Sequence, residues 1–169
     1  MSANRVAVVV LSLLTALLLQ GSVLARMSFL GAKPDLVLVV VVCFALSDGP
    51  AAGMGAGFGA GLVADLLGTH TLGLLALVYC VVGYAGGVIR SYFDRLATFT
   101  PMLVIGGLTA VAVLMYSGLG ALLGDPRISA EPVARSLLLT SLYDVVLTPF
   151  VFAAVTALRS RSDDPRGAR

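Results

Sequence analysis

Apolar segments of helical length, separated by short connections, occupy nearly the whole chain. Hydrophobic residues make up 59% of the sequence and charged residues 12%, whereas charged residues are roughly a quarter of an average soluble domain. The mean hydropathy is +1.02. A soluble fold of this chain would leave far too much apolar surface in water. The sequence therefore predicts an all-α, polytopic transmembrane helical bundle with no extramembrane domain.

The 169 residues accommodate about six spans, since one span needs ~20 residues. We expect a single transmembrane domain over 1–158 and a charged, disordered cytoplasmic tail over 159–169. The expected spans are 5–25, 35–47, 51–68, 74–89, 101–123 and 136–158. The second would reach only ~20 Å of a ~30 Å hydrocarbon core, so we expect tilt or burial against neighbours. The first segment is also compatible with a cleaved signal peptide, but further apolar segments follow at once, which favours a retained span.

The distribution of basic residues favours an orientation with both termini in the cytoplasm. Six spans would place seven arginines inside and four basic residues outside. The inner set is Arg5, Arg90, Arg95, Arg159, Arg161, Arg166 and Arg169, and the outer set is Arg26, Lys33, Arg127 and Arg135.

The segment 49–73 is rich in glycine and contains a carboxylate. Its small residues recur at steps of four, which lie on one face of a helix. This face holds Gly53, Gly57, Gly61 and Asp65, and Gly83 and Gly87 repeat the spacing in the next segment. Small residues let membrane helices approach closely, so these are candidates for helix packing or a partner interface. If these residues form a partner interface, we expect Gly57→Leu or Gly61→Leu to weaken partner association and leave membrane insertion intact.

Gly55, Gly57 and Gly59 fit a dinucleotide-binding fingerprint at 55–60, but that motif needs a preceding strand in a soluble α/β unit. The apolar context favours close helix packing instead.

Two carboxylates, Asp65 and Asp144, lie well inside expected spans. Each costs about 2.5–3.5 kcal/mol at a helix centre, so each should face protein or water. Thr140 and Thr148 lie one turn from Asp144, and Pro149 removes the usual donor for the carbonyl of Val145, which predicts a kink. The acids either line a proton or cation pathway or form hydrogen bonds between helices that fix packing or a partner interface, and we favour the second. Asp144 and Pro149 are therefore further candidates for helix packing or a partner interface.

No sequence pattern indicates an enzyme, a cofactor or a metal site. His70, the single histidine, lies in the expected turn 68–73 without other ligating residues around it. Cys43 and Cys80 lie in apolar runs, which predicts buried thiols rather than a disulfide or metal pair. The basic residues are scattered, so we expect no nucleic-acid partner.

Several short motifs together indicate a family. They are Pro34-Asp35-Leu36, Gly49-Pro50, the run from Gly61 through Asp65 to Leu67, Gly73-Leu74 followed by Tyr79, Gly83 and Tyr84, and Tyr143-Asp144 before Pro149. In these motifs the chain resembles the MreD family of rod shape-determining membrane proteins, although that family more often has an amide residue near Asp144.

The resemblance implies a non-catalytic scaffold of the cell-elongation machinery in the bacterial plasma membrane. Its partners would be the lipid bilayer and the single-span periplasmic protein MreC, with the actin-like MreB and the enzymes of lateral peptidoglycan synthesis contacted indirectly. The family is also similar in fold to the substrate-binding components of energy-coupling-factor vitamin transporters, which gives an alternative function. A vitamin site needs several convergent anchors. The outer-side residues, which also include His70 and Glu131, form no dense polar or aromatic cluster, so the scaffold is favoured.

Overall fold

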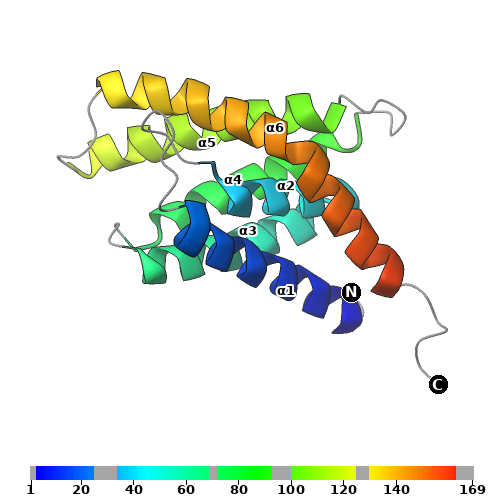
Figure 1. Ribbon diagram of the computed structural model, residues 1–169. Helices are drawn as coiled ribbons and strands as arrows, with labels where there is room; N and C mark the ends of the chain where they lie inside the picture. The colour runs from blue at the N-terminus through cyan, green and yellow to red at the C-terminus, as the bar shows by residue number, and fades with distance from the viewer. Residues whose placement is uncertain (1–2, 25–33, 69–71, 93–99, 125–129, 163–169) are drawn as a thin grey trace.

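The computed structural model describes residues 3–24, 34–68, 72–92, 100–124 and 130–162 (Figure 1). Within these ranges the chain forms α-helices and one π-helical turn and contains no strand, which confirms the predicted all-α fold. The elements are α1 (Ala3–Leu19), η1 (Gln20–Leu24), α2 (Leu36–Asp48), α3 (Pro50–Leu67), α4 (Leu74–Ile89), α5 (Thr100–Leu122) and α6 (Ala130–Ser162). In the part of the chain that the structure describes, three segments are long and apolar enough to cross a membrane: Pro50–Leu67, Pro101–Leu122 and Leu137–Ala157.

The last helix is longer than the sequence indicates. It begins at Ala130 and ends at Ser162, so it extends beyond the expected span 136–158 at both ends and includes the first four residues of the tail that was expected to be disordered, 159–169. Pro132 does not prevent this start, because proline is tolerated in the first helical turn, where its missing N–H would have no partner. Residues 163–169 lie outside the described ranges.

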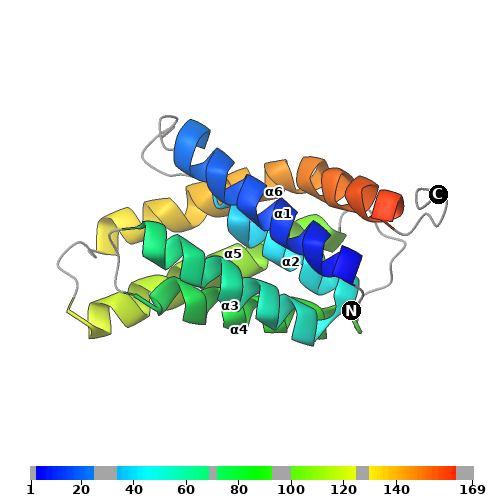
Figure 2. The ribbon, with the colours of Figure 1, turned by 90° about the horizontal axis from the view of Figure 1, so that it is seen from below.

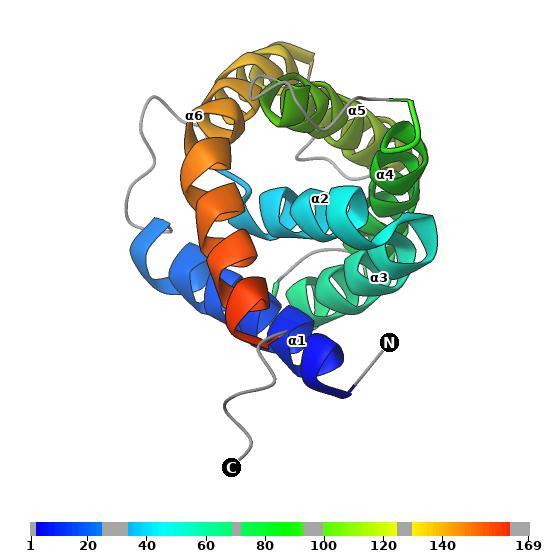
Figure 3. The ribbon, with the colours of Figure 1, turned by 90° about the vertical axis from the view of Figure 1, so that its right-hand side faces the viewer.

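The short helix α2 lies at the centre of the bundle. Figure 3 shows it enclosed by the other helices, and it contacts each of α1, α3, α4, α5 and α6. All nine residues from Val37 to Ala45 expose at most 6% of their surface. A helix that is apolar on every side belongs in such a position. Its 13 residues are therefore accommodated by burial against neighbours.

A tight turn connects α2 to α3. Gly49 has φ 95°, a conformation that glycine adopts without steric cost, and its N–H donates to the carbonyl of Ala45 at 2.9 Å. Pro50 follows as the first residue of α3, a position that suits proline because φ is already helical. The two helices can therefore fold back on each other within one residue.

The helices α3 and α4 form the most extensive pair in the bundle, and Figure 2 shows them side by side. Their contact is made by backbone atoms. A Cβ on Gly53 would collide with the carbonyl of Gly83, one on Gly57 with the carbonyl of Tyr79, and one on Gly61 with the backbone of Ala76. The paired numbers run in opposite directions, so the helices are antiparallel.

A Cβ on Gly87 would collide in the same way with Pro50. We call Gly53, Gly57, Gly61, Gly83 and Gly87 the glycine interface. Because lipid chains are as apolar as the side chains that they would replace, membrane helices associate mainly through such close packing. The glycine interface is covered by helices of the same chain.

The helix α6 packs along α5 and then diverges from it. Figure 1 shows α6 following α5 over its first half and turning toward α1 over its second. Pro149 lies inside this helix, and interior proline is the usual cause of a sharp bend. The change of direction brings α6 into contact with α1 as well as α5 and α2.

Two neighbouring glycines of α3 give a matched test of the glycine interface. We expect Gly57→Ala to destabilise the protein by about 1–3 kcal/mol, because the added methyl meets backbone that cannot move aside. Gly59 has no atom within 4 Å of a Cβ position, so Gly59→Ala should be neutral or stabilising by about 0.5–1 kcal/mol. Thermal unfolding in detergent measures both. Equal melting temperatures for the two variants would contradict the packing described here.

Candidate functional site

The N-terminus of α2 is held by side chains rather than by water. Asp35 is its N-cap residue, and its Oδ1 accepts the N–H of Leu38 at 3.1 Å. An aspartate at this position satisfies one of the N–H groups that a helix start leaves without a partner. A second N–H, from Val37, donates to Oε1 of Gln20 in η1 at 3.2 Å.

Asp144 approaches the same helix start from α6. Its Oδ1 accepts the backbone N–H of Asp35 at 2.8 Å, and its Oδ2 accepts the hydroxyl of Thr109 in α5 at 2.9 Å. The side chain of Asp144 is fully buried, at 0% exposed. One carboxylate thus connects α6, α5 and the start of α2.

Tyr79 completes the group from α4. Its hydroxyl donates to Oδ2 of Asp35 at 2.5 Å. We call Gln20, Asp35, Tyr79, Thr109 and Asp144 the polar cluster. Its members come from η1, the start of α2, α4, α5 and α6, so segments far apart in the sequence meet at one point.

The two carboxylates of the polar cluster act as hydrogen-bond acceptors. Each of the four oxygens of Asp35 and Asp144 receives a proton donor from the chain itself: two backbone N–H groups and two hydroxyls. Buried carboxylates with these partners have their hydrogen-bonding capacity met within the protein. Removing one of them would leave its donors unpaired in an apolar interior. The arrangement fixes the helices relative to one another.

Asp65 performs a related task at the end of the glycine interface. It is 1% exposed, and its carboxylate accepts the N–H groups of Gly73 at 2.9 Å, Ala76 at 3.1 Å and Leu75 at 3.3 Å. The N-cap residue of α4 is Gly73, which has no side chain to offer. Asp65 of α3 therefore supplies the cap of α4, and its negative charge lies at the positive end of that helix dipole.

The residues singled out from the sequence fall into two groups. Gly53, Gly57, Gly61, Gly83 and Gly87 form the glycine interface with Asp65 at its end, whereas Asp144 belongs to the polar cluster. Thr148 donates to the carbonyl of Asp144 at 2.6 Å rather than to its carboxylate. Pro149 follows directly in α6. A role of any of these residues in binding a partner stays a prediction.

The remaining ligand-type residues form no joint site in the described ranges. Cys43 is buried, Cys80 is partly exposed, and both are free thiols. No group of three or more His, Cys, Asp or Glu side chains able to hold a metal occurs in the part of the chain that the structure describes. His70 lies outside that part.

Four members of the polar cluster were not expected as site residues. Gln20, Asp35, Tyr79 and Thr109 all serve the start of α2 or its neighbour Asp144. A signal for Asp35 was present, because an aspartate directly before an apolar run is an N-cap pattern. Tyr79 was named only as part of a family motif, and Gln20 and Thr109 are single polar residues in apolar segments that no local pattern marks.

The fold and these sites define a helical membrane protein whose buried polar residues join its helices. A family model described as rod shape-determining protein MreD matches residues 1–157. The chain belongs to the MreD family, and it has a role in rod shape determination. No curated protein matches the chain, and no solved structure matches it.

Removal of the Asp65 carboxylate should loosen the start of α4. We expect Asp65→Ala to cost about 0.5–2 kcal/mol, as for other lost caps, and Asp65→Asn to cost less because one acceptor oxygen remains. Hydrogen exchange in detergent measures this at the amides of Leu75 and Ala76, which should exchange about 2–30-fold faster in Asp65→Ala, since 1.4 kcal/mol corresponds to a factor of ten. The amide of Leu38, capped by Asp35 instead, is the internal reference. A uniform acceleration across both helix starts would contradict a local capping role.

The bond between Asp144 and Thr109 can be measured by a double-mutant cycle. We expect Asp144→Ala to destabilise the protein by about 1–3 kcal/mol, because the N–H of Asp35 and the hydroxyl of Thr109 lose their acceptor. Combined with Thr109→Val, the cycle should give a coupling energy of roughly 0.6–2 kcal/mol. Thr156→Val is the control, since that hydroxyl is exposed and bonds only its own helix. Additive effects of the Asp144 and Thr109 substitutions would contradict a direct bond.

Proposed function

We propose that this chain is a non-catalytic integral membrane scaffold of the bacterial cell-elongation machinery. It acts in cell shape and lateral peptidoglycan synthesis by associating with the single-span periplasmic protein MreC. The match of the MreD family model over residues 1–157 is the observation that carries the proposal.

The use of the buried acids supports a structural role. Asp65, Asp144 and Asp35 accept hydrogen bonds from backbone N–H groups and hydroxyls of the chain. An ionisable residue inside a membrane protein is by default a candidate for transport or catalysis. Here the carboxylate oxygens already bind the ends and faces of neighbouring helices. This engagement favours a rigid scaffold over a proton or cation pathway.

The outer surface suits association within the bilayer. Large apolar side chains are exposed on the peripheral helices, among them Leu138, Leu142, Val146 and Phe150 at steps of four along α6. In a membrane such a face contacts lipid chains or an apolar partner helix. The scaffold would lie in the plasma membrane with six spans and both termini in the cytoplasm, and it would reach MreB and the wall-synthesis enzymes through its partner.

Affinity purification tests the proposal. The tagged chain, extracted from its native membrane in mild detergent, should co-purify a single-span periplasmic protein together with peptidoglycan-synthesis enzymes, identified by mass spectrometry. An unrelated multi-helix membrane protein carrying the same tag at the same expression level is the control bait. Enrichment over that control should exceed tenfold.

Two results would contradict the scaffold. Recovery of paired ATPases with a coupling membrane subunit would indicate a transporter component. Recovery of the same proteins by both baits would remove the basis for a specific association.

A further inference from the structure

The two acids of the polar cluster lie side by side in the interior of the bundle. Asp144 accepts the backbone N–H of Asp35 at 2.8 Å, so its carboxyl group lies next to the residue that carries the other one. Asp144 is 0% exposed. Two negative charges this close and away from water repel each other strongly, and such pairs hold a proton between them unless a positive charge is near.

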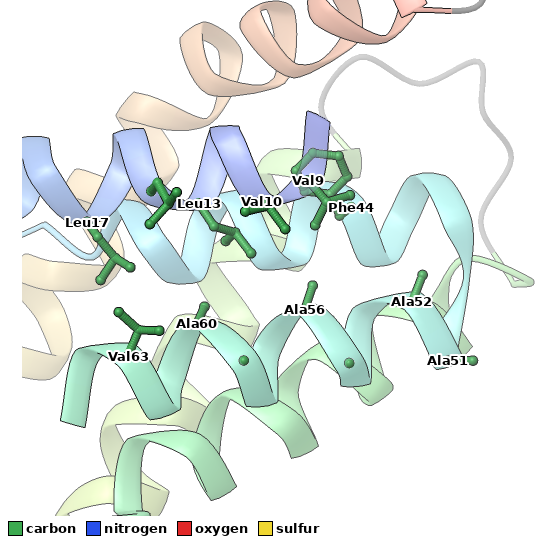
Figure 4. A pocket seen from close by; sticks show the side chains of 13 residues that line it. Val9, Val10, Leu13, Leu17, Phe44, Ala51, Ala52, Ala56, Ala60 and Val63 are labelled. Carbon is green, nitrogen blue, oxygen red and sulfur yellow. The ribbon is translucent and has the colours of Figure 1, made fainter. Parts of the chain in front are cut away.

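The surrounding helices bring no positive charge to this pair. The neutral Thr109 comes from α5, the neutral Gln20 from η1 and Tyr79 from α4. Figure 4 shows the groove between α1 and α3, beside α2, and its lining consists only of apolar residues and glycine. Among the side chains that the structure describes, the basic one is Arg90, which lies beside Gly49 at the opposite end of α2. A proton is therefore the remaining means of reducing the negative charge of the pair.

The surroundings of Asp35 stabilise a negative charge. Asp35 is the N-cap residue of α2 and accepts the N–H of Leu38, so it lies at the positive end of that helix dipole. The hydroxyl of Tyr79 donates to its Oδ2 at 2.5 Å, within the range of about 2.5–2.7 Å for a hydroxyl bound to an ionised carboxylate. Tyr79 has no second hydrogen-bond partner in the described part of the chain. It could not accept a proton from Asp35 without leaving its own hydrogen unpaired.

The surroundings of Asp144 suit a neutral carboxylic acid instead. Its Oδ2 lies 2.9 Å from the hydroxyl oxygen of Thr109, which is longer than the contact of an ionised carboxylate. A hydroxyl can accept as well as donate, so Thr109 can receive a hydrogen from the acid and donate its own to the carbonyl one turn earlier in α5. Thr15 and Thr156 make this bond to the residue four positions before them. The Oδ1 of Asp144 accepts the N–H of Asp35 in either case.

We propose that the pair holds one proton at neutral pH, carried by Asp144, while Asp35 carries the negative charge. The proton lies on Oδ2 of Asp144, between α6 and the Thr109 hydroxyl of α5. It allows two carboxyl groups to lie together at the start of α2. Raising the pH removes this proton and places a second charge beside Asp35, which loosens the attachment of α6 to α2. The chain holds the proton in place and does not conduct it.

Infrared spectroscopy of the full chain in phosphatidylcholine vesicles detects the proton. A carboxylic acid has a carbonyl stretching band that a carboxylate lacks. The wild-type protein should show this band at neutral pH, and Asp144→Asn should lose it. Asp65→Asn is the matched control and should keep it, because Asp65 is also buried but accepts only backbone N–H groups, to which a carboxylic acid could not donate. Absence of the band from the wild type would overturn the proposal.

Two amide variants show which residue holds the proton. Asp144→Asn keeps an acceptor for the N–H of Asp35 and a donor for Thr109, so its melting temperature should match that of the wild type. Asp35→Asn leaves the hydroxyl of Tyr79 without a carboxylate and should raise the unfolding equilibrium constant about tenfold or more. The opposite order of stability would place the proton on Asp35 and overturn the assignment.

The pH dependence of the melting temperature is a further test. Between about pH 6 and 9, below the range of about 10 in which phenols such as Tyr79 and Tyr143 titrate, the wild type should lose stability relative to Asp144→Asn. Equal profiles for the two proteins would contradict the proposal. Lys33 lies outside the described ranges, two positions before Asp35, and Lys33→Gln should change neither the band nor the profile. A band that is absent from the wild type and appears in Lys33→Gln would show that Lys33 neutralises the pair instead.

Discussion

The backbone N–H groups at the start of α2 set the main constraint on this fold. At about 20 Å, α2 is shorter than the ~30 Å hydrocarbon core, so it cannot bring both ends to water while the chain lies in a membrane. Each unsatisfied backbone group there would cost several kcal/mol. Asp35, Gln20 and Asp144 supply the missing acceptors. Placing these three side chains requires η1 and α6 to meet beside α2, and so the short helix organises the helices around it.

A second constraint acts on the rest of the bundle, because its apolar helices must associate in an apolar solvent. Burial away from lipid offers little driving force, so close packing and hydrogen bonds must provide it. The glycine interface brings α3 and α4 into backbone contact, and Asp65 at its end caps α4. The polar cluster joins α4, α5 and α6 to the start of α2. A bundle fixed in this way presents a defined outer surface, which the proposed scaffold function would require.

Local sequence patterns predict much of this architecture. Apolar runs and breakers predict the helices, and the range 74–89 coincides with α4. The four-residue glycine spacing identifies the face that meets α4. What no local pattern contains is the pairing of distant polar residues: Asp144 lies 109 positions from the backbone N–H that it binds. Hydropathy also does not predict the length of α6. It shows where a segment becomes polar, whereas the helical backbone continues into polar sequence as far as Ser162.

The central claim is that α2 is a core helix shielded from lipid, and labelling from within the bilayer tests it most directly. A photoactivated carbene reagent dissolved in the membrane modifies side chains that contact lipid, and mass spectrometry of the unmodified sequence locates the products. Residues 37–43 should remain unlabelled, while exposed positions of α6 such as Leu142 and Phe150 are modified. Labelling of 37–43 at the level of α6 would show that α2 faces lipid, and it would contradict the account of how its polar start is satisfied.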